Sequence, residues 1–193
     1  MSNELKYGDR IHLQNGYNNW QGGYLDTNGH ASNSGAKYEV STTDTPNRGT
    51  GTGTWEVLSA SGKPAGTAVV TGDLIYLRNL YGGDGGYLDT NNHATTDQKN
   101  AGGKYDVSTS QNRDRAEGTG RWRIFAQTSS PLDQSVRVGD TVHLFNTYDD
   151  NGGFLETNHN STASGGKYDV CTNGYYNRSN STVADWKIHK APA

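Results

Sequence analysis

Four groups of polar side chains occur three times each, at corresponding places in three copies of one repeated segment. They are an acid after a Leu (Asp26, Asp89 and Glu156), an Asn with a nearby His (Asn28 and His30, Asn91 and His93, Asn158 and His159), a Lys-Tyr pair (Lys37–Tyr38, Lys104–Tyr105 and Lys167–Tyr168) and an Asn-Arg pair (Asn47–Arg48, Asn112–Arg113 and Asn177–Arg178). A carboxylate accepts hydrogen bonds from hydroxyls, an amide or guanidinium donates to oxygens, and an aromatic face covers apolar C–H groups. A sugar site requires these groups, so we expect one shallow sugar site in each copy.

Each recurrence also has a structural interpretation. Asp and Asn side chains bond nearby backbone amides in turns, an Arg can join two loops through an acid, and a Lys stem can cover the edge of a core. The third His stands one place nearer to its Asn than the other two do, which favours the structural interpretation for the His. The Asn-Arg pair recurs inside a loop whose other residues differ between copies, which makes its recurrence more informative.

Aromatic residues follow the first segment of every copy. They are Tyr17 and Trp20 in the first copy, Tyr81 in the second and Tyr148 in the third. An aromatic ring at this place could cover the apolar face of a sugar beside the polar groups.

Four short pieces in each copy must position these side chains. They are residues 8–15, 72–79 and 139–146; residues 22–28, 85–91 and 152–158; residues 37–40, 104–107 and 167–170; and residues 55–57, 122–124 and 186–188. Apolar and polar residues alternate in these pieces, which predicts half-buried strands, while Gly, Asn, Asp, Ser and Thr between them predict turns. We expect Trp55, Trp122 and Trp186 to lie in the core.

Twelve strands in three equal copies, each ending in a Trp strand, resemble the β-trefoil. The resemblance covers essentially all of the chain and implies an all-β protein with one domain over residues 1–193, in lobes of about 5–63, 69–130 and 136–190. A propeller is the alternative repeat architecture, but its blades of about 40–45 residues are shorter than these copies, and three blades would be too few.

Composition narrows the class of protein. The 193 residues carry 17 Lys and Arg against 20 Asp and Glu. The chain therefore has no surplus of basic residues, which argues against nucleic acid as a partner. The single Cys171 excludes a disulfide within the chain and a cysteine metal site. Residues 1–7 are polar, and no apolar run is long enough to span a bilayer. We therefore expect a cytoplasmic protein, without membrane insertion, that would leave the cell only by a non-classical route.

The acid motif is similar to that of the ricin-B-like β-trefoil lectins, in which an acid follows the apolar pair of the second strand of a lobe. Tyr24-Leu25-Asp26, Tyr87-Leu88-Asp89 and Phe154-Leu155-Glu156 match this motif, and the Asn of each Asn-Arg pair stands where that family has a later-loop Asn. The family's Gln-x-Trp motif is missing, because Gly53, Gly120 and Ala184 stand two residues before the three Trp. The resemblance implies a multivalent lectin or agglutinin for glycans on glycoproteins, glycolipids or cell surfaces, of the galactose or GalNAc type.

Three other functions compete with this interpretation. An enzyme is disfavoured because the chain has no Gly-x-Ser-x-Gly, His-Glu-x-x-His or phosphate-loop motif, although a glycosidase with paired carboxylates stays open. A β-trefoil protease inhibitor would act through one exposed loop, and a protein-interaction (cytoskeletal) trefoil would need no shared polar site. Asp84 and the run at 149–151 offer oxygen ligands for calcium, but the first copy has no equivalent. We therefore predict a non-enzymatic protein without cofactor or metal.

Overall fold

The computed structural model describes residues 3–127 and 132–192 as an all-β chain of twelve antiparallel strands. The strands are β1 (Arg10–Asn15), β2 (Tyr24–His30), β3 (Ala36–Thr43), β4 (Trp55–Ser59), β5 (Leu74–Asn79), β6 (Gly86–His93), β7 (Gly103–Ser110), β8 (Trp122–Gln127), β9 (Thr141–Asn146), β10 (Gly153–Asn160), β11 (Tyr168–Asn173) and β12 (Trp186–Lys190). The prediction of four strands per copy is confirmed. Residue 130, the expected end of the second copy, lies outside the described residues.

Short helical turns interrupt the strands. They are α1 (Tyr17–Trp20), α2 (Thr96–Asn100) and the 3-10 turns η1 (Tyr81–Gly83), η2 (Tyr148–Asp150) and η3 (Arg178–Asn180). In the part of the chain that the structure describes, no helix has the length and apolar character needed to cross a membrane.

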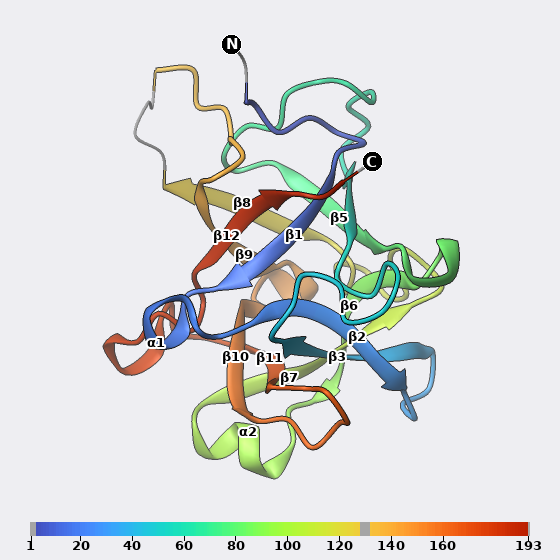
Figure 1. Ribbon diagram of the computed structural model, residues 1–193, viewed down its shortest axis with the longest axis vertical. Helices are drawn as coiled ribbons and strands as arrows, with labels where there is room; N and C mark the ends of the chain where they lie inside the picture. Colours follow the sequence, from blue (N-terminus) through green and yellow to red (C-terminus); the bar gives the residue numbers. More distant parts are fainter. Residues whose placement is uncertain (1–2, 128–131, 193) are drawn as a thin grey trace.

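The strand pairings form two layers. The first and fourth strands of the copies pair around a closed ring in the order β1, β4, β5, β8, β9, β12 and back to β1. The second and third strands form three hairpins, β2–β3, β6–β7 and β10–β11, whose third strands β3, β7 and β11 pair with one another. Figure 1 shows the ring strands in the upper half of the molecule and the hairpins, with α2, in the lower half.

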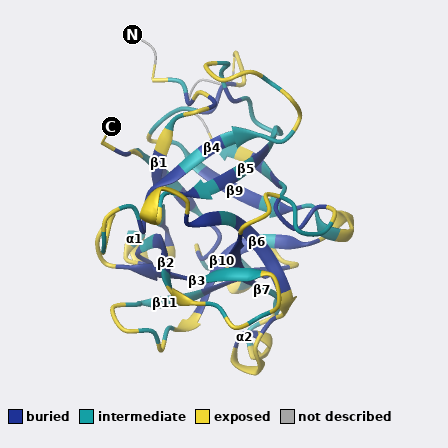
Figure 2. Cartoon of the chain, turned by 90° about the vertical axis from the view of Figure 1, so that its right-hand side faces the viewer, coloured by how far each residue is buried: buried dark blue, intermediate teal, exposed yellow. Residues whose placement is uncertain are grey.

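The core lies inside the ring and against the hairpins. Trp55, Trp122 and Trp186 are fully buried, as predicted, together with the aliphatic residues of the first strands. The indole N–H of each Trp donates 3.0 Å hydrogen bonds to the carbonyl oxygens of Leu25, Leu88 and Leu155 respectively. The fourth strand of each copy is thereby tied to the second strand of the same copy, and Figure 2 shows the buried residues running through the strands while the exposed ones lie in the loops.

Buried Asn residues at the ends of the first strands join the copies into a ring. The hydroxyls of Thr27, Thr90 and Thr157 donate hydrogen bonds of 3.2, 3.3 and 3.0 Å to the Oδ1 atoms of Asn79, Asn146 and Asn15. Each bond leads from one copy to the next, and the last returns to the first copy. All six side chains are buried, and the three bonds together link the copies in a closed cycle.

The Gly-Gly pairs before the second strands serve this ring in two ways. The second glycine of each pair has a positive φ of 91 to 97°, which confirms the expected turn. The first glycine has no such φ, but a Cβ on it would lie 2.1–2.2 Å from the Oδ1 of the buried Asn. A side chain at this first position would displace the Asn that links the copies.

Candidate functional site

The predicted acids are fully buried and paired with arginine. Arg48 Nε lies 3.2 Å from Asp26 Oδ2 and its Nη2 donates to the Thr27 carbonyl at 3.0 Å. Arg178 makes the same pair of contacts, at 3.1 Å to Glu156 Oε2 and 3.3 Å to the Thr157 carbonyl. The Asn-Arg motif of the first and third copies therefore joins the loop before the fourth strand to the second strand.

The Asn-Arg pair expected in the second copy, Asn112–Arg113, is displaced by two residues from the pair that makes the equivalent contacts. Arg115, not Arg113, lies 3.2 Å from Asp89 Oδ2 and donates to the Thr90 carbonyl at 2.9 Å. Asp114, not Asn112, takes the place of the loop Asn: its Oδ1 accepts from the Gly120 amide at 3.0 Å. Asn47 and Asn177 accept in the same way from the amides of Gly53 and Ala184.

Arg113 lies instead over the ring of Tyr76, at 5.6 Å from its centroid, and Asn112 donates its backbone N–H to the Ser110 hydroxyl. Counting back from the Trp would have found the true pair. Arg48 and Arg115 both stand seven residues before the Trp of their own copy.

Burial governs the electrostatics of the three ion pairs. It raises the pKa of Asp26, Asp89 and Glu156 above their ordinary values, while the adjacent guanidinium groups act in the opposite direction. The carboxylates are 0% exposed, whereas the arginine side chains remain 34, 26 and 22% exposed. The acids therefore hold the arginines in place, and within each pair the arginine is the partner that solvent can reach.

The recurring Asn residues after the acids connect neighbouring copies. Asn28 donates to the Ser164 carbonyl at 2.9 Å, Asn91 to the Ser34 carbonyl at 3.1 Å and Asn158 to the Gln98 carbonyl at 3.1 Å. In each case the acceptor lies in the hairpin turn of another copy. These contacts support the structural interpretation of the three Asn residues.

The Lys-Tyr pairs meet an aromatic residue of the next copy at the surface. Tyr38 packs edge-on against Tyr81 at 5.5 Å, Tyr105 against Tyr148 at 5.5 Å and Tyr168 against Tyr17 at 5.3 Å. The ammonium of the preceding Lys lies 5.8, 5.6 and 6.0 Å from the Tyr38, Tyr105 and Tyr168 ring centroids. We name these groups, with the equivalent arginines of the three ion pairs, the boundary clusters: Lys37, Tyr38, Arg48 and Tyr81; Lys104, Tyr105, Arg115 and Tyr148; Lys167, Tyr168, Arg178 and Tyr17.

Histidine packs against the tyrosine ring in two of the boundary clusters, whereas His159 lines the cleft of the third without that ring contact. His30 lies 5.3 Å from the Tyr38 ring and His93 lies 5.8 Å from the Tyr105 ring. In the third copy Asn160 is the residue paired across the strands with Tyr168. His159 instead has a φ of 76° and lies 3.5 Å from Asp97, so its sequence shift is a real loss of equivalence.

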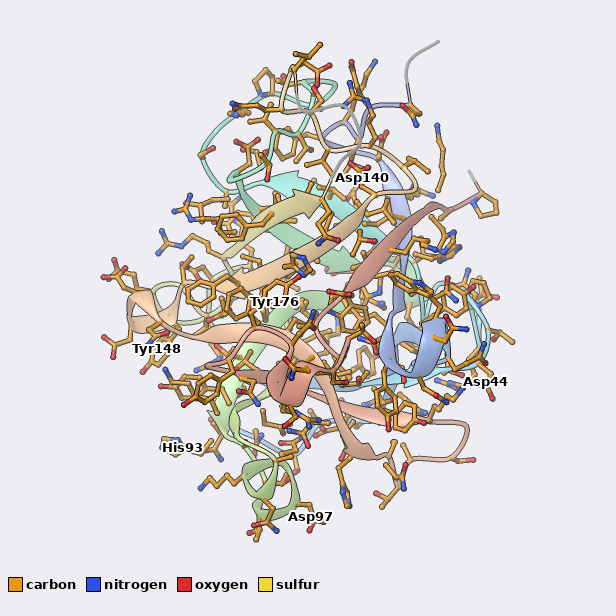
Figure 3. The ribbon with its side chains drawn as sticks, turned by 90° about the vertical axis from the view of Figure 1, so that its left-hand side faces the viewer. Asp44, His93, Asp97, Asp140, Tyr148 and Tyr176 are labelled. Atoms are coloured by element: carbon orange, nitrogen blue, oxygen red, sulfur yellow. The ribbon has the colours of Figure 1, made fainter. Side chains whose placement is uncertain are left out.

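Two boundary clusters open on clefts. The cleft at the second cluster, about 460 Å³, is lined by His93, Tyr105, Arg115 and Tyr148 and by residues 33–34 of the first copy. The third cluster lines a smaller cleft of about 180 Å³. Figure 3 shows His93 and Tyr148 on the same side of the molecule. Each cleft offers two tyrosine rings and a guanidinium for stacking and hydrogen bonding, but no carboxylate from the buried acids.

A metal site needs several ligand side chains arranged around one point. Within residues 3–127 and 132–192, no group of three His, Cys, Asp or Glu side chains is arranged to hold a metal ion.

The sequence matches no protein-family model and no curated protein. Solved structures are similar in fold. A Caenorhabditis elegans protein of unknown function has a TM-score of 0.73 at 15% identity, covering 98% of this chain and 97% of its own. The SDF2-like protein from Arabidopsis thaliana has a TM-score of 0.71 at 18% identity, covering 96% and 94%. An S. cerevisiae protein O-mannosyltransferase complex, bound to the sugar donor, has a TM-score of 0.70 at 15% identity over 97% of this chain and 25% of the other. At these identities the likeness concerns the fold alone.

Proposed function

We propose that the chain is a single β-trefoil domain. Two observations support this architecture: the closed ring of six strands, and the three hairpins whose third strands pair around a common centre. The polar ring from Thr to Asn, repeated between all three copies, gives the arrangement the approximate three-fold symmetry that a trefoil requires.

We propose further that the protein is a non-enzymatic carbohydrate-binding protein with up to three sites, one at each boundary cluster. The observation that carries this proposal is the recurrence, at three surface places, of an aromatic pair beside a lysine that lies outside the core. Tyr17 and Tyr81 are 37 and 42% exposed, although exposed aromatic groups are costly to leave in water. Rings held by their neighbours lose little freedom on binding, which favours stacking on a sugar face.

The proposed binding groups differ from those of the ricin-B-like resemblance. There the acid itself contacts the sugar; here the acid would act indirectly, by fixing the arginine that donates to sugar oxygens. The preference for galactose or GalNAc that the resemblance implies stays a hypothesis. Here it would depend on contacts from the tyrosine rings and the arginine, not from the acid. One similar structure is of a protein O-mannosyltransferase complex bound to the sugar donor, and the match covers 25% of that chain.

Each site is shallow, so we expect weak single-site affinity. Dissociation constants of about 1 mM to 1 µM correspond to about −4 to −8 kcal/mol. Three sites on one rigid body would gain strength on a glycan-covered surface by simultaneous engagement. Agglutination of glycan-coated cells would follow from this multivalency.

The first test is a glycan array with the purified protein, followed by titration calorimetry with the best sugar. A stoichiometry of two or three is expected, and Tyr148→Ala should lower it by one. Tyr87→Ala is the matched control, because Tyr87 packs against Tyr76 outside the boundary clusters. A folded protein that binds nothing on the array would contradict the proposal and direct attention to the protease-inhibitor or protein-partner alternatives.

A further inference from the structure

Three carboxylates converge where the three hairpins meet. Glu39, Asp106 and Asp169 occupy the same place in β3, β7 and β11, between the Tyr and the Val of each third strand. The pairing of these strands sets Glu39 opposite Ser108, Asp106 opposite Cys171 and Asp169 opposite Ser41. The acids therefore surround the centre of the hairpin layer.

These carboxylates have little positive charge near them. None of the ion pairs found in residues 3–127 and 132–192 includes Glu39, Asp106 or Asp169. Burial raises the pKa of Asp169, and the nearby His159 and Asp97 act on that pKa in opposite directions. Partly buried carboxylates that repel one another and lack a cation are costly, so this centre is electrostatically incomplete.

A cavity of about 220 Å³ lies at this centre. The three carboxylates line it, together with Ser41, Gln98 and Ser161, and α2 and the turn at residues 161–163 form its walls. The Gln98 amide reaches Asp106 at 3.5 Å. Polar groups from all three copies thus face one small space.

Ser41 provides an observation independent of the acids. It is only 3% exposed, and its hydroxyl has no hydrogen-bond partner. Ser41 lies two residues after Glu39 on β3, so both side chains are on the same face of the strand, toward the cavity. Ser108, at the same place in β7 and opposite Glu39, is likewise buried with an unpartnered hydroxyl. Buried polar groups are rarely left without a partner, so these two hydroxyls beside the acids leave a polar partner to be supplied.

We propose that this axial acidic cavity binds a primary ammonium group, R–NH3+, of a small amine or a 2-amino sugar. An ammonium carries three N–H donors and no acceptor, which suits a cavity that is lined by three carboxylates and by no Lys, Arg or His. Its positive charge offsets the repulsion among the acids. No three of the described acidic, His or Cys side chains are placed to hold a metal ion, whereas an ammonium binds through longer hydrogen bonds.

The test is titration calorimetry at pH 8 and low salt with 1,4-diaminobutane, glucosamine, N-acetylglucosamine and tetramethylammonium. Saturable binding of both amines assigns the site to the ammonium group itself, and binding of glucosamine alone assigns it to amino sugars. N-acetylglucosamine lacks the charge and tetramethylammonium lacks N–H donors, so neither should bind here. Absence of saturable binding by both amines, or equal binding of tetramethylammonium, would overturn the proposal.

Substitutions localise the effect. Glu39→Gln and Asp106→Asn preserve side-chain shape, and each removes one charge-assisted hydrogen bond, so each should weaken amine binding about tenfold. Asp149→Asn, at an exposed carboxylate of η2, is the control and should leave the affinity unchanged. Thermal unfolding establishes that each variant is folded. Unchanged amine affinity in both cavity variants would place the binding elsewhere and refute the assignment.

The probe 1,4-diaminobutane is not a sugar, so its binding separates the axial cavity from the boundary clusters. Tyr148→Ala should abolish one neutral-sugar site while leaving amine binding intact, so the two proposals can fail separately.

Discussion

The buried acid–arginine pairs and the surface boundary clusters both recur three times, but they recur with different fidelity. The pairs keep the same contacts in every copy: guanidinium Nε to carboxylate, and Nη2 to the next carbonyl. The boundary clusters keep their tyrosines but vary around them, since His30 and His93 give way to Asn160. The constancy of the buried pairs follows from packing. Packing does not explain why tyrosines at the surface, half-buried or exposed, are kept while their neighbours vary.

The third copy shows how tightly the interior is constrained. Where the first two copies place Asp opposite Ser across the hairpin, the third places Glu156 opposite Cys171. The longer Glu156 accepts hydrogen bonds from Asn158 and Asn173 as well as from Arg178. Both residues of the cross-strand pair have changed together, and the arginine contact is preserved.

The largest loss of stability is expected from Arg115→Ala. This change leaves Asp89 buried without its partner, and breaking a buried pair in this way costs about 3–5 kcal/mol; exposure of a quarter of the Arg115 side chain places the expected loss at the lower end. Arg113→Ala is the matched control, two residues away, and should change the free energy of unfolding by about 0.5 kcal/mol or less. Urea unfolding measures both, and equal losses would refute the pairing described for the second copy.

A smaller loss is expected from Glu156→Asp. The shorter acid cannot satisfy all three of its donors, and an unsatisfied buried donor costs about 1–3 kcal/mol. Adding Cys171→Ser restores the Asp–Ser combination of the other copies and should recover part of the loss. A double-mutant cycle by chemical unfolding measures this coupling, and strictly additive effects would show that the two changes are independent.

The acids at the hairpin centre should make the protein less stable as pH rises. This is the opposite of the effect of an ion-paired carboxylate whose pKa is lowered by folding. Burial, then the charges of Asp106 and Asp169, raises the pKa of Glu39 from 4.5 to about 7, and burial raises the pKa of Asp106 to about 6. The folded state therefore holds protons that the unfolded state has lost, and stability falls as pH rises from about 4.5 to 7. The melting temperature of Glu39→Gln should fall less over this range and exceed that of the unmodified protein at pH 8; parallel curves would contradict the assignment.

The smallest effect on stability is expected at the surface. Tyr38→Ala in the first boundary cluster removes a half-buried ring outside the core cluster, and should cost about 1 kcal/mol, within the usual range for single substitutions. Its sugar affinity or stoichiometry should nevertheless change more than in any interior variant that stays folded. If Tyr38→Ala instead unfolds the protein without altering sugar binding, the distinction between the two regions fails.

Much of the fold could be predicted because the copies repeat the strand pattern. Strand number, order and the buried Trp followed from alternation and from the three-fold comparison alone. The short helix α2 was missed, although Thr95 and Gln98 form a capping box that the sequence contains. The contacts between copies could not be predicted, because they depend on which hairpin turn lies beside which second strand.

The sugar-binding role of the candidate site stays a prediction. The structural alternative, in which an Arg joins two loops through an acid, is confirmed at Arg48 and Arg178 in the first and third copies. In the second copy Asn112–Arg113 has the same residue types as the pairs of the other copies, but Asp114 and Arg115 make the equivalent contacts. The accessibility of the acids could not be predicted either, since the same Asp that could accept from a sugar can equally serve a buried guanidinium.

The ring of Thr-to-Asn hydrogen bonds has a consequence for the unit of folding. Within one copy taken alone, Thr27 lacks Asn79 and Asn15 lacks Thr157, so a donor and an acceptor are left open at opposite edges. Such a fragment is self-complementary head to tail, and three of them satisfy every bond with none left over. A peptide of one copy should therefore fold only as it assembles into a closed trimer, with folding that depends on peptide concentration.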